Sequence, residues 1–257
     1  MQMKKIIILI VCFFSIGSLF AYDFVENGIY YYIIPSANKQ VMVTYGPLKG
    51  SYSGEITIPE KVEFDSEIYD VVSINVEAFY NCNYLKSVTI PISVKSIGRE
   101  AFYGCTRLTE INIPDSVKSI GQEAFKGCNY LKTVRIGKSV KTIGTGAFTD
   151  TCQGIKDIYC YAENPPSADG RTFNGLLYDR TRLHLPANSL EKYQASSPWS
   201  YFKYKTSLRD ETPINSNVIN NTSSKRIYDL NGRYSAKKGG INIIQLFDGT
   251  TEKVYLK

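Results

Sequence analysis

Residues 93–115 read SVKSIGREAFYGCTRLTEINIPD, and residues 116–138 read SVKSIGQEAFKGCNYLKTVRIGK. Aligned without a gap, the two segments are identical at 13 of 23 positions. Residues 70–92 are a looser copy, and a fourth copy begins at Ser139. The phenylalanine of an Ala-Phe pair recurs every 23 residues, at Phe79, Phe102, Phe125 and Phe148. A fixed period of about 20–50 residues indicates units that bury their apolar side chains only by stacking on one another.

Each copy contains one short predicted strand. Residues 88–90, 111–113 and 134–136 alternate apolar, polar and apolar side chains with a β-branched bias, which is typical of a strand with one buried face. The Glu-Ala-Phe-x-x-Cys segment suits a short helical or 3₁₀ piece of about one turn. Stacked strands would run parallel, with a rise of about 4.8 Å per coil. We therefore expect columns of identical side chains inside the coils, with Phe102 directly over Phe125.

The repeat resembles the BspA-like class of leucine-rich repeat, whose unit has the form C-x-x-L-x-x-V-x-I-P-x-S-V-x-x-I-G-x-x-A-F-x-x-C. The resemblance covers residues 54–160. It implies a curved solenoid with a binding face, of the kind found on secreted and surface proteins of anaerobic bacteria, adhesins among them. The expected fold class is a leucine-rich-repeat solenoid, mainly β with short helical or 3₁₀ turns, followed by a small C-terminal β-meander.

The N-terminus has the pattern of a signal peptide over residues 1–21. Lys4 and Lys5 precede an apolar run from residue 6 to residue 20, and Ala21 lies at the expected cleavage point. The run is too short for a transmembrane helix. Cys12 lies inside it, so there is no lipobox. We expect a protein without a transmembrane span, secreted or held on the outer cell surface.

The segments around the repeats are predicted to close the solenoid. Residues 22–69 are expected to form N-terminal capping hairpins, with Asn27-Gly28 as a strong turn signal and a second hairpin near residues 65–69. Residues 70–160 hold the leucine-rich repeats. Residues 161–207 are assigned to a C-terminal cap with a strand at 182–185, a helix at 189–195, and Trp199 and Phe202 closing the last coil. Residues 208–224 are predicted to be a linker.

Residues 225–257 form a separate predicted unit. The phrase YDLNGR at 228–233 followed by GINII at 240–244 resembles the C-terminal sorting domains of type IX secretion cargo. The resemblance implies that the export machinery is a partner of this segment. A small packing module is the alternative interpretation.

The distribution of charge argues against a nucleic-acid partner. The formal net charge of +6 falls to +4 without Lys4 and Lys5, and residues 225–257 carry seven basic and three acidic residues, so the rest of the chain is neutral. A ladder of lysines recurs at the repeat period, with glutamates recurring nearby; the lysines are Lys95, Lys118 and Lys141, and the glutamates Glu77, Glu100 and Glu123. A solvated face is the favoured interpretation of this ladder, and a polyanion site is the alternative.

The sequence offers no catalytic constellation, metal site or cofactor motif. The single histidine, His184, lies in a strand-like apolar run, where a structural role is favoured. Five cysteines follow the leader: Cys82, Cys105, Cys128, Cys152 and Cys160. Three of them recur at the repeat period, so adjacent coils would bring them close enough for a disulfide. Buried reduced thiols are the simpler interpretation.

A binding surface is the remaining functional feature. Polar side chains flank the central apolar residue of each strand and should form four rows on one parallel sheet: Ser87 and Thr89, Glu110 and Asn112, Thr133 and Arg135, and Asp157 and Tyr159. We expect a non-enzymatic protein that recognises an extracellular protein or glycan through this face, as an adhesin does. The alternative is a passive spacer of the cell envelope without a specific ligand.

Overall fold

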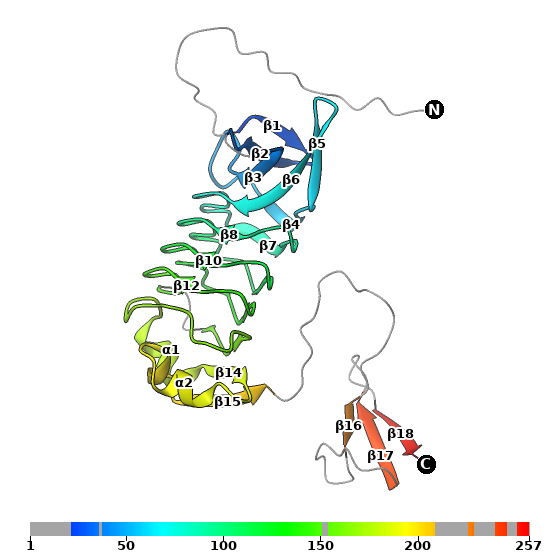
Figure 1. The fold of residues 1–257 in the computed structure, drawn as a ribbon, viewed down its shortest axis with the longest axis vertical. Helices are drawn as coiled ribbons and strands as arrows, with labels where there is room; N and C mark the ends of the chain where they lie inside the picture. The colour runs from blue at the N-terminus through cyan, green and yellow to red at the C-terminus, as the bar shows by residue number, and fades with distance from the viewer. Residues whose placement is uncertain are drawn as a thin grey trace. The chain divides into compact units, whose positions relative to one another are not determined.

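The computed structural model describes residues 22–35, 38–150 and 154–208, and the backbone of three strands between residues 226 and 256 (Figure 1). The chain divides into two compact units, Met1–Pro213 and Ile214–Lys257. The expected signal peptide, the linker beyond residue 208 and Cys152 lie outside the described residues. No helix among the described residues is long and apolar enough to cross a membrane.

Two hairpins open the first unit, as the turn signals predict. Strands β1 (Phe24–Glu26) and β2 (Ile29–Ile33) are antiparallel, and the turn between them has positive φ at Asn27 and Gly28. Strand β3 (Gln40–Thr44) pairs with β2. Strands β5 (Lys61–Phe64) and β6 (Glu67–Ile74) form the second hairpin.

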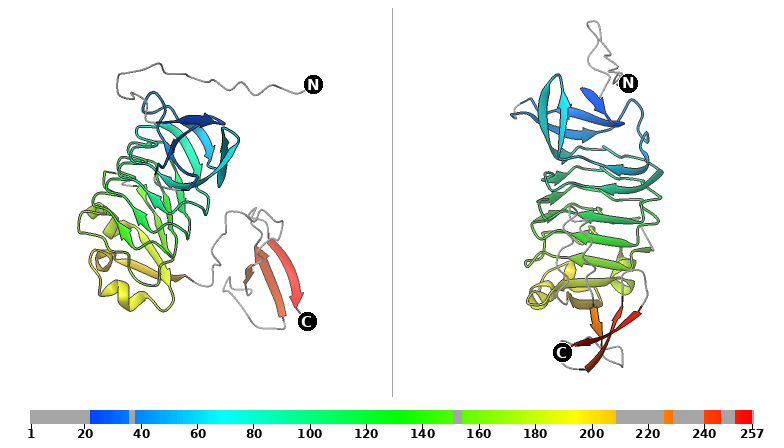
Figure 2. Two further views of the ribbon diagram at one scale, coloured as in Figure 1. Left: turned by 45° about the horizontal axis from the view of Figure 1, so that its top comes forward. Right: turned by 90° about the vertical axis from the view of Figure 1, so that its right-hand side faces the viewer.

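The coils then contribute strands to two sides of the solenoid. Figure 2 shows strands of successive coils lying one above another. One side carries β4 (Ser53–Thr57), β7 (Tyr84–Thr89), β9 (Glu110–Ile113), β11 (Thr133–Ile136), β13 (Asp157–Cys160), β14 (Arg182–Pro186) and β15 (Tyr204–Leu208). The other side carries β8 (Ser96–Ile97), β10 (Ser119–Ile120) and β12 (Thr142–Ile143), which continue the sheet of β6. Where strands of neighbouring coils pair, they pair in parallel, because each coil returns the chain in the same direction.

The first of these sides is not one continuous sheet. Strands β9, β11, β13, β14 and β15 form a five-stranded sheet, whereas β7 pairs with β4 in a separate two-stranded sheet. The expectation of four rows on a single sheet is therefore wrong for the row of Ser87 and Thr89. Side-chain periodicity places residues in columns, but it does not specify whether backbone groups of adjacent coils come into hydrogen-bonding register.

Aromatic rings form a column through the interior. The rings of Phe102 and Phe125 are stacked with centroids 5.1 Å apart and planes 3° apart, which confirms the predicted stacking. Phe79 lies over Phe102 at 4.8 Å, and Phe125 over Phe148 at 5.3 Å. The column continues to Phe173, 5.6 Å from Phe148, within the segment assigned to the C-terminal cap. Five rings at one coil spacing therefore share one core.

The segment that contains the Ala-Phe pair takes the form of hydrogen-bonded turns. In each turn an amide donates three residues back, as from Tyr103 to the carbonyl of Glu100 at 3.1 Å. The same position has positive φ in four successive copies: Glu77, Glu100, Glu123 and Gly146. A left-handed residue ends helical progression, so the turns do not extend into a helix.

The far end of the first unit is closed by short helices and aromatic side chains. Helix α1 (Gly175–Arg180) and helix α2 (Leu190–Gln194) precede a 3₁₀ helix, Trp199–Tyr201. Trp199 and Phe202 are buried and contact Phe173 edge-on, with centroids 5.1 and 5.2 Å away. These contacts cover Phe173, the last ring of the column, and so close the core at this end of the first unit.

The second unit contains the predicted β-meander. Strands β16 (Arg226–Tyr228), β17 (Gly240–Gln245) and β18 (Thr251–Leu256) form an antiparallel sheet in that order.

Candidate functional site

The five-stranded sheet presents a polar surface that we call the outer face. Along each strand the side chains alternate between the core and this surface, so Val134 is fully buried while its neighbours Thr133 and Arg135 are not. The outer face consists of Glu110, Asn112, Thr133, Arg135, Asp157, Tyr159, Arg182, His184, Tyr204 and Thr206.

Strand register arranges this face in two rows that run along the solenoid. One row is Glu110, Thr133, Asp157, Arg182 and Tyr204. The other is Asn112, Arg135, Tyr159, His184 and Thr206. Six of the eight predicted residues lie in these rows. Ser87 and Thr89 lie on β7, where their partners in register are Glu55 and Thr57 of β4.

Arg135 links the two rows. Its guanidinium group lies 3.4 Å from a carboxylate oxygen of Glu110 on the preceding strand. It also lies over the ring of Tyr159 on the following strand, 5.3 Å from the ring centroid. The side chain is thus held between an anion and an aromatic face.

His184 stacks on the same tyrosine from the next strand. The two rings have centroids 4.2 Å apart and are inclined by only 8°. Because the strands of Arg135 and His184 flank the strand of Tyr159 on opposite sides, both faces of the Tyr159 ring are covered. The ring therefore presents its edge, rather than a face, to a ligand.

Asp157 anchors the histidine. It accepts hydrogen bonds from Nε2 of His184 at 2.8 Å and from Nε and Nη2 of Arg182 at 2.9 and 3.2 Å. Burial by itself raises the pKa of the Asp157 carboxyl, but the hydrogen bonds from His184 and Arg182 outweigh it and hold that pKa below the ordinary value of 3.8. The carboxylate therefore stays ionised in the folded protein.

Nδ1 of His184 contacts the hydroxyl of Thr206 at 3.0 Å, which completes a carboxylate–imidazole–hydroxyl chain. This connectivity occurs in hydrolases, but Thr206 lies exposed in a strand at the edge of the sheet. The geometry is suited to holding side chains in place. It is consistent with the structural role expected for His184.

Sequence reasoning missed Arg182, His184, Tyr204 and Thr206 as members of the face. The alternation Arg182-Leu183-His184-Leu185 could have identified Arg182 and His184, since the two leucines are fully buried and the other two residues point outward. The signal was hidden because this strand follows a segment that departs from the 23-residue period.

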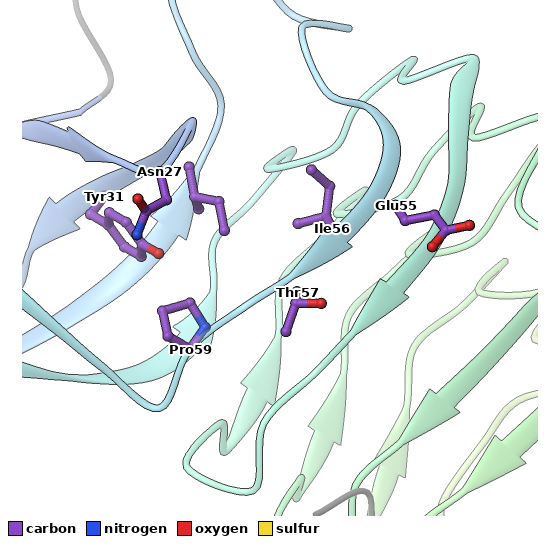
Figure 3. A pocket seen from close by; sticks show the side chains of 7 residues that line it. Asn27, Tyr31, Glu55, Ile56, Thr57 and Pro59 are labelled. Atoms are coloured by element: carbon purple, nitrogen blue, oxygen red, sulfur yellow. The ribbon is translucent and has the colours of Figure 1, made fainter. Parts of the chain in front are cut away.

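A small pocket lies elsewhere, between β2 and β4 (Figure 3). Its volume is about 170 Å³, and it is lined by Asn27, Ile29, Tyr31, Glu55, Ile56, Thr57 and Pro59. Pockets for drug-sized ligands measure about 300–1,000 Å³, so this one has room for only a small group.

The four described cysteines are buried free thiols: Cys82, Cys105, Cys128 and Cys160. The Sγ atoms of Cys105 and Cys128 each donate to a backbone carbonyl of the preceding coil, at 3.1 Å. Burial raises the pKa of Cys82 to about 12 and that of Cys160 to about 11. Three or more potential metal ligands do not gather anywhere in the described part of the chain.

Comparison with known proteins identifies the class of fold. Residues 53–175 match the BspA type Leucine rich repeat region, in six copies. A leucine-rich repeat protein from Bacteroides ovatus ATCC 8483 is 29% identical in sequence; the alignment covers 72% of this chain and 41% of that one, with a TM-score of 0.51. A leucine-rich repeat protein from Bacteroides capillosus ATCC 29799 is 27% identical over 53% of this chain and 96% of that one, with a TM-score of 0.46.

The first unit thus has the fold of a leucine-rich-repeat solenoid, and its residues 53–175 match the BspA type of repeat. The chain spans 41% of the length of the Bacteroides ovatus protein. No curated protein matches the sequence.

Proposed function

We propose that this protein is a non-enzymatic binding protein, exported to the cell surface or the medium, that recognises an extracellular protein or glycan through the outer face. The observation that carries the proposal is the row of Arg135, Tyr159 and His184. Arginine and tyrosine are enriched among residues that dominate binding energy. Here their side chains are already held in one conformation, which lowers the entropy cost of binding.

A protein ligand is favoured over a glycan at this position. Sugar rings stack on the open face of an aromatic side chain, and both faces of Tyr159 are covered by Arg135 and His184. A protein can instead contact the tyrosine edge and hydroxyl, together with the guanidinium groups of Arg135 and Arg182.

The test replaces Arg135 by Glu and Tyr159 by Ala together. The matched control, Arg99→Glu with Tyr32→Ala, makes the same substitutions away from the outer face. A pull-down from extracellular-matrix proteins and a glycan array first identify ligands of the unaltered chain. The outer-face variant should then lose at least about tenfold in affinity, while the control should bind as the unaltered chain does. If every ligand still binds the outer-face variant, with its circular dichroism unchanged, the face is wrongly assigned.

A passive envelope spacer is the second candidate. Its support is that Asp157 and Glu110 both form ion pairs with arginines of the outer face. A surface whose charges pair with one another does not need a ligand to neutralise them. A chain that captures no ligand, together with a deletion strain of altered envelope integrity, would favour it.

The proposal also includes export directed by signals at both termini of the chain. Residues 1–21 would act as the signal peptide, and residues 225–257 as a sorting segment read by the export machinery. Deleting residues 225–257 should leave the protein inside the outer membrane, whereas the full chain should reach the surface or medium. Equal surface levels of both forms would favour the alternative, a packing module.

A further inference from the structure

The lysine ladder on the β8–β10–β12 side is aligned by backbone hydrogen bonds. The amide of Lys118 donates to the carbonyl of Lys95, and the amide of Lys141 donates to that of Lys118, both at 2.8 Å. All three side chains are exposed. The register places three cations in a line along the solenoid, about 4.8 Å apart at the backbone.

The glutamates that recur near this ladder pair with other cations. Glu77 pairs with Lys49 at 2.5 Å, Glu100 with Arg99 at 2.5 Å, and Glu123 with Lys126 at 3.4 Å. Asp115, near the same side, pairs with Lys138 at 3.6 Å.

None of the three ladder lysines forms an ion pair within the described ranges. The ladder is therefore an unbalanced positive row, and its repulsion would be relieved by an anion lying along it.

A column of hydroxyl groups runs beside the lysines. Register pairs Ser73 with Ser96, Ser96 with Ser119, Ser119 with Thr142, and Thr142 with Ser167. All five side chains are half-buried or exposed. Hydroxyl groups both donate and accept hydrogen bonds, so this column can bind the hydroxyl or sulfate oxygens of a chain that follows the lysines.

We propose that the ladder of Lys95, Lys118 and Lys141, with its adjoining hydroxyl column, binds a linear acidic polysaccharide lying parallel to the solenoid axis. One sugar ring along such a chain is close in length to one coil step, and sulfate and carboxylate groups project on flexible bonds. Each lysine of the ladder can therefore form an ion pair with about one negatively charged group of the polysaccharide per coil. This site is separate from the outer face and does not depend on the function proposed for it.

The geometry fits other polyanions less well. Same-face side chains of an extended acidic peptide recur every two residues, at about 6.6–6.8 Å, which does not match the coil spacing. Single-stranded nucleic acid needs aromatic platforms for its bases. The columns that adjoin the lysines instead hold Ser93, Ser116 and Ser139 on one side and Ser96, Ser119 and Thr142 on the other.

The experiment compares two triple variants of the full chain. Lys95→Gln, Lys118→Gln and Lys141→Gln remove the ladder. Lys86→Gln, Lys132→Gln and Lys156→Gln remove three exposed lysines in or next to β7, β11 and β13, on the other side of the coils, and change the net charge equally. Affinity is measured for heparin and polygalacturonate, with poly-L-glutamate and oligo(dT) as comparison polyanions, at about 50 mM and about 200 mM salt.

The ladder variant should bind the acidic polysaccharide about tenfold more weakly than the unaltered chain, since three exposed ion pairs are lost. The control variant should change affinity by less than about twofold. Equal weakening by both variants, tighter binding of poly-L-glutamate or oligo(dT), or no polysaccharide binding at either salt concentration would overturn the proposal. The Arg135→Glu, Tyr159→Ala chain should keep its polysaccharide affinity, so this result and the outer-face result are separable.

Discussion

Replacing Phe125 by Ala should destabilise the solenoid strongly. Phe125 is fully buried and stacks on Phe102 at 5.1 Å and on Phe148 at 5.3 Å. Phe→Ala substitutions in packed cores cost about 3–5 kcal/mol. Each ring pair contributes about 0.5–1.5 kcal/mol of that cost beyond the area it buries.

The cavity left by Phe125→Ala should collapse poorly, which places the loss near the upper end of that range. The amide of Phe125 donates to the carbonyl of Ala147 at 3.0 Å, and that of Phe102 donates to Ala124 at 2.7 Å. These bonds set the coil spacing, so neighbouring rings cannot close the gap without breaking them.

Urea denaturation followed by circular dichroism and by tyrosine fluorescence measures the loss. Tyr130→Ala is the matched control, because Tyr130 is 63% exposed in the next turn and should cost less than about 0.5 kcal/mol. A loss below about 1.5 kcal/mol for Phe125→Ala, or one equal to that of the control, would refute the shared-core reasoning.

Three further outcomes follow from particular contacts. Gly121→Ala should cost about 1–3 kcal/mol, because its Cβ would lie 2.5 Å from backbone atoms of the preceding coil, whereas Gly170→Ala, with open space around it, should be nearly neutral in the same urea titration. Asp157→Asn should destabilise the protein more at pH 7 than at about pH 3. The depressed pKa of the Asp157 carboxyl stabilises the fold at pH values above the pKa of the unfolded state, and this stabilisation is lost as the pH falls through the pKa of the folded state. A difference in the free energy of unfolding that does not change with pH would contradict the network around Asp157. The thiols of Cys82, Cys105, Cys128 and Cys160 should resist iodoacetamide in the native protein at about pH 8 and react after unfolding, since all four are buried away from the reagent. Burial also raises the pKa of Cys82, Cys105 and Cys160, which disfavours their thiolates. Mass spectrometry of each site checks this, and rapid native labelling would contradict their burial.

The repeat period was sufficient to predict the interior. Residues at equal positions in successive 23-residue units occupy equal positions in successive coils, so Phe102 and Phe125 had to meet once the units stacked. The two N-terminal hairpins were also predictable, because their turns are local and need residues that tolerate positive φ. The repeat period did not predict that Phe173 joins the column of rings, because Phe173 follows Phe148 by 25 residues and so falls outside the 23-residue pattern.

The sequence by itself determined the solenoid, its columns and six of the outer-face residues, because these depend only on constant spacing and on alternation along a strand. Only the tertiary structure decided which charges pair. It assigned Glu77, Glu100 and Glu123 to Lys49, Arg99 and Lys126 rather than to the lysine ladder. It also joined Asp157 to His184 and Arg182, and separated β7 from the main sheet. Such pairings depend on side-chain direction and on non-repeating segments brought alongside the coils, neither of which a period encodes.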